Sequence, residues 1–132
     1  MISGLSVCRA RVLRLNFRSQ TCWAEPYCII QPRDAADVST ALKIIGKLRV
    51  RFAVRSGGHS PNPTWSSVGN DGILLDLQRL DSVAVSDDGS FASVGSGAQW
   101  GNVYLALDSH KTMVVGARSP TIGVGGSILG GL

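Results

Sequence analysis

Apolar and polar residues alternate in a way that predicts a strand, a helix and a second strand over residues 28–55. Cys28 to Ile30 and Phe52 to Val54 are short apolar runs of the kind that form buried strands. Between them, apolar side chains recur every three or four residues, as on one face of a helix: Val38, Ala41, Leu42 and Ile45. A strand, a helix and a strand in this order predict a parallel unit with a right-handed crossover.

Polar residues at both ends of this helix support its placement. Asp34 stands where a side chain caps the first turn, and Asp37 puts a negative charge near the positive end of the helix dipole. Gly46 and Lys47 lie near the expected end. We therefore expect a capped helix between the two strands.

The pattern after Ser60 predicts a loop, several short strands and a second helix. Pro61 to Gly72 is rich in proline, glycine and small polar residues, which is typical of an ordered surface loop. Apolar runs predict strands at residues 73–77, 83–85, 91–94 and 113–115. Asp87-Asp88-Gly89 predicts a hairpin turn, and Gln99 to Leu107 a helix. Three aromatic residues are expected to pack against the protein rather than stack on a ligand: Trp65, Trp100 and Tyr104.

Composition and charge are those of an ordinary globular domain. The chain has 132 residues, of which 44% are hydrophobic and 17% charged. Its 13 basic residues include four arginines that precede Glu25, the first of nine acidic residues, so the remainder of the chain carries equal numbers of each sign. This balance gives no basic face for phosphates, and we expect no nucleic acid partner.

Residues 1–20 lack the continuous apolar stretch of a secretory signal because arginines interrupt their apolar positions. No segment has the length and apolarity of a membrane span, so we expect no membrane partner. An organelle presequence is one interpretation of this segment, and we favour an unstructured extension or a misassigned start. The cellular location stays undecided. The expected division is an extension at residues 1–20 and one domain at residues 21–132.

The cysteines do not indicate a metal site. There are three of them, Cys8, Cys22 and Cys28, so they cannot all pair with one another, and none stands at a ligand spacing. We expect Cys28 to be a core thiol, and the disulfide status of all three stays open.

Two glycine clusters carry the candidate chemistry. The first, Arg55-Ser56-Gly57-Gly58-His59-Ser60, follows a predicted strand, and its backbone N–H groups can face an anionic or electron-rich ligand. Taken alone, His59 in such a turn is more typical of a structural hydrogen bond. The second cluster, residues 116–131, combines glycines with hydroxyl side chains and predicts a long loop able to carry a pyrophosphate without a lysine.

A Rossmann-like nucleotide-binding module is a weaker alternative. Gly95-Ser96-Gly97 begins a G-x-G-x-x-G pattern, but Trp100 occupies the third glycine position, where helix and strand must pack closely. The second candidate, Gly123-Val124-Gly125, fails in the same way at Ile128.

Five blocks in a fixed order resemble the FAD-binding domain of the vanillyl-alcohol-oxidase and p-cresol-methylhydroxylase (PCMH) superfamily, in particular its berberine-bridge-like oxidoreductases. The blocks are Ile30-Gln31-Pro32-Arg33, Phe52 to Ser60, Leu74-Leu75-Asp76-Leu77, Val94 to Gly101 and Pro120 to Gly126. The resemblance covers about residue 23 to the end of the chain. It implies an α+β fold in which a small parallel β-α-β unit is followed by a mixed sheet with helices, with FAD between the sheets.

The resemblance also implies an oxidoreductase that passes hydride from a substrate to FAD and then to oxygen. In the family, the histidine of the first cluster is bonded to the 8α-methyl of the flavin, which here is His59. Ser119 stands where some relatives have a second flavin-linked cysteine, so a single link is expected. The implied cofactor-binding residues are Arg55, Ser56, Gly57, Gly58, His59, Ser60, Ser119, Thr121, Gly123, Val124, Gly125 and Gly126.

The family pattern is expected to continue beyond Leu132, into the rest of the flavin domain and the substrate half with its catalytic base. The catalytic residues and the small-molecule substrate therefore cannot be named from this chain. A truncated or degenerate flavin-fold fragment without activity is the alternative. Such a fragment would expose apolar strand edges, and we expect it to be unstable or to aggregate alone.

Overall fold

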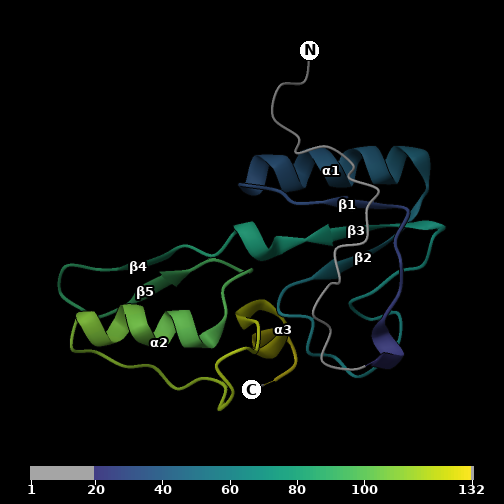
Figure 1. The fold of residues 1–132 in the computed structure, drawn as a ribbon. Helices are drawn as coiled ribbons and strands as arrows, with labels where there is room; N and C mark the ends of the chain where they lie inside the picture. Colours follow the sequence, from purple (N-terminus) through teal and green to yellow (C-terminus); the bar gives the residue numbers. More distant parts are fainter. Residues whose placement is uncertain (1–19, 132) are drawn as a thin grey trace.

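The computed structural model describes residues 20–131, and expectations for earlier residues, including Cys8, lie outside them. Three parallel strands form the first sheet in the order β1 (Cys28–Ile30), β3 (Gly72–Asp76) and β2 (Arg51–Arg55) (Figure 1). The expected parallel arrangement of the first two strands is confirmed. They are not neighbours, however, because β3 lies between them and pairs with both.

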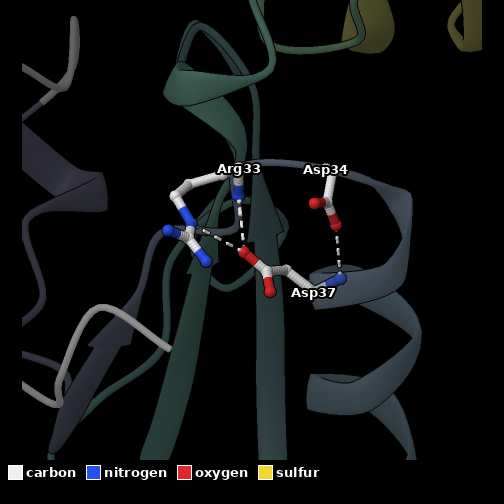
Figure 2. A network of polar contacts seen from close by, with 3 residues as sticks. All are labelled: Arg33, Asp34 and Asp37. Carbon is white, nitrogen blue, oxygen red and sulfur yellow. Dashed lines mark hydrogen bonds and ion pairs between the residues drawn. The ribbon is translucent and has the colours of Figure 1, made fainter. Parts of the chain in front are cut away.

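Helix α1 (Ala35–Leu48) joins β1 to β2 and begins at three hydrogen bonds among Arg33, Asp34 and Asp37 (Figure 2). Asp34 Oδ1 accepts the backbone N–H of Asp37 at 2.8 Å, while Asp37 Oδ2 accepts the backbone N–H of Arg33 at 3.1 Å and its Nε–H at 3.2 Å. The bond from the Arg33 backbone is the main cause that lowers the pKa of the Asp37 carboxyl. The expected cap at Asp34 is confirmed, and the helix ends at Arg49, whose φ of 52° is left-handed.

The apolar stripe of α1 is confirmed only in part. Ala41 and Ile45 are buried, but Leu42 is 41% exposed. The spacing of apolar residues shows which side chains share one face of the helix. It does not show how much of that face the neighbouring sheet covers.

The second half of the chain forms a hairpin with a helix against it. Strands β4 (Val83–Val85) and β5 (Ala92–Val94) are antiparallel, and the turn between them contains Gly89 with a φ of 68°. Helix α2 (Trp100–Ser109) packs on this hairpin (Figure 1). Their shared core consists of Ala98, Trp100, Val103, Leu107, Ala117 and Val124, with Val83, Val85 and Val94 against it.

Two expectations about the last twenty residues are wrong. Residues 113–115 are not a strand: they have no partner strand among the described residues, and Met113 and Val115 are 91% and 96% exposed. The cluster at residues 116–131 is not all loop, because it contains helix α3 (Val124–Leu129). Glycine disfavours helix, but contacts with neighbouring segments override that propensity here.

Short 3-10 helices lie at Gln20–Cys22 and Leu77–Arg79. Trp65 is 72% exposed, so the expectation that it packs is wrong. One aromatic residue in a loop has no periodicity to show which way it faces.

Cys28 is buried, but it is disulfide-bonded, so the expectation of a core thiol is wrong. Sequence spacing could not predict this, because it does not show which sulfurs lie within bonding distance. No helix within residues 20–131 has the length and apolarity needed to cross a bilayer.

Candidate functional site

The first glycine loop begins at a buried pair of charged residues. Arg55 and Asp76 end the neighbouring strands β2 and β3 at the same register, and they are 2% and 0% exposed. Burial lowers the pKa of the Arg55 guanidinium, and the negative charge of Asp76 opposes that shift. Asp76 also accepts hydrogen bonds from Gln31 Nε2 at 3.0 Å and from the backbone N–H of Gln78 at 3.2 Å. Arg55 therefore lies buried at the start of the loop and does not line the loop's exposed surface.

The two glycine loops lie directly against one another. A methyl group added at Gly57 would overlap the backbone nitrogen of Gly123, and one added at Gly123 would overlap the backbone nitrogen of Gly57. Gly58, the next residue, is buried and has a φ of 67°, a conformation that other residues rarely adopt. Close approach of the two backbones thus requires glycine on both sides.

Ser96 connects both loops to the turn after the hairpin. The hydroxyl of Ser56 donates a hydrogen bond of 2.7 Å to the carbonyl oxygen of Ser96. Gly125 approaches the same carbonyl, which would lie 2.7 Å from a methyl group added there. Sequence reasoning included Ser96 in a block that resembles the family, but it did not identify Ser96 as a site residue.

A hydrogen bond between side chains also joins the loops. His59 Nε2 and Thr121 Oγ1 are 2.9 Å apart, although 62 positions separate them in the sequence. The hydroxyl of Thr121 lies 3.3 Å from that of Ser119. Ser60, next to His59, is held from the other side because its carbonyl oxygen accepts a hydrogen bond of 3.2 Å from Cys22 Sγ. Nothing in the local sequence signalled the Cys22 contact.

Helix α3 begins where the second loop meets α2. The backbone N–H of Val124 donates to the carbonyl oxygen of Ala98 at 2.9 Å, and Val124 itself is buried in the core. No heavy atom lies within 4 Å of a methyl group added at Gly126. The start of this helix is therefore fixed on one side and open on the other.

The structure brings the sequence-predicted residues together from two distant parts of the chain. Residues 55–60 and residues 119–126 meet at Gly57, Gly123, His59 and Thr121. Four of the predicted residues are buried: Arg55, Gly58, Gly123 and Val124. The others are at least partly exposed, so they can face a ligand.

Comparison with known proteins gives close relatives. Residues 26–132 match the family model described as FAD binding domain. The chain is 44% identical over 114 residues to an FAD-dependent monooxygenase of Arthrobotrys oligospora, and 44% identical over 112 residues to another of Penicillium terrestre. These matches cover 86% and 85% of this chain and 22% of each relative. The chain thus spans less than a quarter of the length of these relatives.

Solved structures share the fold. Glucooligosaccharide oxidase from Acremonium strictum, described with a 6-S-cysteinyl, 8α-N1-histidyl FAD, matches with a TM-score of 0.82 and 26% identity, over 96% of this chain and 27% of its own. The berberine-bridge-like enzyme 1 of Physcomitrella patens, as its D396N variant, matches with a TM-score of 0.70 and 30% identity, over 78% of this chain and 22% of its own. These findings exclude the Rossmann-like alternative and confirm the resemblance and its α+β fold. The chain belongs to the FAD binding domain family, with the fold of the berberine-bridge-like FAD oxidoreductases.

Proposed function

We propose that this chain is the cofactor-holding part of an oxidoreductase that transfers hydride from an organic substrate to FAD and then to dioxygen. The observation that carries the proposal is the junction of the two glycine loops, with His59 of one bonded to Thr121 of the other at 2.9 Å. The family match supports FAD as the cofactor. Because the chain spans only 22% of its first relatives, the activity belongs to the whole protein and stays a proposal.

The residues at the junction fit FAD. Among residues 20–131, the backbone N–H groups of Gly57 and Gly58 donate to no other residue, although Gly58 is buried. Buried N–H groups normally have an acceptor, and phosphate or flavin oxygens are suitable acceptors for adjacent glycine amides. The open space at Gly126 leaves room for such a ligand beside the second loop. A cradle of amides and hydroxyls can thus replace a lysine at the pyrophosphate.

His59 holds the cofactor covalently in this proposal. When bound, FAD supplies hydride acceptance at its flavin N5 and reoxidation by dioxygen. His59 would be bonded through an imidazole nitrogen to the flavin 8α carbon, with loss of one methyl C–H bond and one imidazole N–H bond, and dioxygen would take up the two electrons and two protons as hydrogen peroxide. Ser119 holds a hydroxyl where a thiol would be needed for a second link, so His59 is the single attachment point.

The test is to incubate the purified chain with FAD in air, denature it, desalt it and measure its visible spectrum and the mass of the His59 peptide. We expect a retained yellow chromophore and a mass increase equal to FAD less two hydrogens. His59→Ala is the matched control, and it should lose all colour on denaturation. Unmodified His59 peptide in a protein that binds FAD would contradict covalent attachment. Absence of FAD binding by the native chain would contradict the proposal that the two glycine loops bind FAD.

A further inference from the structure

We infer that Thr121 is a positioning residue for His59, accepting a hydrogen bond from Nε2–H of the imidazole so that Nδ1 presents its lone pair to the flavin. This inference rests on the proposed function, because it concerns how His59 forms its bond to FAD. The supporting contact is the 2.9 Å separation of His59 Nε2 and Thr121 Oγ1.

The tautomer of His59 follows from which atom donates in that contact. In a neutral imidazole one nitrogen carries the proton and the other a lone pair, and only the nitrogen with the lone pair is a nucleophile. When Nε2–H donates to Thr121 Oγ1, the lone pair is on Nδ1. The opposite polarity, with Thr121 donating, would put the lone pair on Nε2, where the threonine already occupies it. Only the first arrangement leaves a nucleophilic nitrogen that does not face Thr121.

Ser119 extends the path by which the proton leaves. Its hydroxyl is 3.3 Å from Thr121 Oγ1, and either oxygen can be the donor. As the bond to Nδ1 forms, the imidazole becomes cationic and Nε2–H becomes more acidic. Thr121 then accepts this proton as its own hydroxyl proton passes to Ser119, and Ser119 releases one proton to solvent water, so the imidazole ends neutral and both hydroxyls are unchanged. His59, Thr121 and Ser119 form a chain of three polar groups at the surface of the loop junction.

Structural support alone does not explain the contact. The bond between His59 and Thr121 is exposed, and an exposed hydrogen bond contributes little to folding because water replaces either partner. Backbone contact between Gly57 and Gly123 already holds the loops together. Loss of the Thr121 hydroxyl should therefore leave the fold intact while changing the behaviour of His59.

The experiment compares Thr121→Val, which removes the hydroxyl at constant shape, with Thr121→Ser, which keeps it. Thr112→Val is the matched control, since Thr112 lines the same surface hollow as Thr121 and makes no side-chain hydrogen bond within the described part of the chain. Two quantities are measured on the full chain. The first is the rate at which the His59 peptide gains FAD, followed by mass spectrometry. The second is the 15N chemical shifts of the His59 ring without FAD, which report the tautomer directly.

We expect Thr121→Val to slow attachment at least about tenfold, and Thr121→Ser and Thr112→Val to stay near the original rate. We also expect the ring shifts to report Nε2–H in the original chain and a mixture of tautomers in Thr121→Val. Attachment at the original rate in Thr121→Val would overturn the inference while leaving the proposed function intact. No attachment in the original chain would overturn both the covalent function and the role of Thr121 in it. In that case the ring shifts would report only whether the hydrogen bond exists.

Discussion

The indole N–H of Trp100 donates a hydrogen bond of 2.7 Å to the hydroxyl of Ser127, joining the first residue of α2 to the middle of α3. Ser127 in turn donates to the carbonyl oxygen of Val124 at 3.0 Å. Gly116 lies against the same indole, where a methyl group would overlap the ring. One side chain thus contacts both the first residue of the second glycine cluster and helix α3 within it.

Trp100→Phe keeps an aromatic ring but removes the N–H, and it should lower the free energy of unfolding by about 1 to 3 kcal/mol, because a partly buried hydroxyl loses its donor and the smaller ring packs less well. Urea unfolding measures this loss. Ser127→Ala removes the same bond from the other side, so the double variant should lose less than the two single variants together. Fully additive losses would show that the bond contributes nothing.

Gly57→Ala should destabilise the chain by about 1 to 3 kcal/mol, because its methyl group overlaps the backbone of Gly123 and the two loops must separate. Gly46→Ala is the control: it lies inside α1 with no heavy atom within 4 Å of the added methyl group. That variant should gain about 0.5 to 1 kcal/mol from the higher helix propensity of alanine. Thermal unfolding measures the stability of both variants. Similar changes in the free energy of unfolding of the two would contradict the close approach of the loops.

Gly126→Ala should separate stability from cofactor binding. The added methyl group meets no protein atom, and Gly126 lies inside α3, so the free energy of unfolding should rise. If FAD occupies the open space there, its dissociation constant should increase about tenfold or more, equivalent to about 1.4 kcal/mol. Flavin fluorescence quenching measures the affinity, with Gly46→Ala again as control. An unchanged affinity would mean that FAD does not pass over Gly126.

Asp88 should titrate far below the ordinary carboxyl range. Its pKa is lowered from 3.8 to about 2, chiefly by the hydroxyl of Ser86, which donates at 2.7 Å, and then by the backbone N–H and hydroxyl of Ser90. A carboxyl with a lowered folded-state pKa stabilises the fold when ionised. Its contribution is therefore complete above about pH 4 and is lost as the pH falls towards about 2.

Ser86→Ala should raise the pKa of Asp88 towards its ordinary value, and carboxyl 13C shifts followed from pH 6 to about 1.5 measure the change. Ser109→Ala removes a serine hydroxyl bonded only to the end of α2, so it should leave the titration of Asp88 unchanged. An equal shift of the pKa in both variants would contradict the local origin of the effect.

Sequence predicted best the elements whose signals are local. Helix α1 could be placed because Asp34 caps it and apolar residues recur within it, and the β4–β5 hairpin because Gly89 lies in its turn. Helix α3 could not be predicted, since its glycines disfavour helix and its support comes from Ala98 and Trp100 elsewhere in the chain. Residues 113–115 were apolar enough for a strand, but strands need a partner, which a run of apolar residues does not reveal.

In the candidate site, too, local patterns could be predicted from the sequence and contacts between distant residues could not. The glycines and His59 could be selected as ligand-binding from their pattern and from the family resemblance. The contact of His59 with Thr121 could not, because it depends on two loops 62 positions apart meeting at Gly57 and Gly123. Ser96 and Cys22 were missed for the same reason: each contributes through a hydrogen bond to a loop residue far from it in the sequence.

The position of β3 between β1 and β2 has a consequence for how the chain is made. Cys28 lies opposite Ile73 and Arg51 opposite Gly72, while β1 and β2 do not pair with one another. A nascent chain that has emerged only as far as Arg55 therefore has no strand ladder to form, however complete its helix is. Neither β1 nor β2 can form its native ladder until residues 72–76 leave the ribosome, and until then the backbone groups and apolar side chains of both strands stay unpaired in the nascent chain.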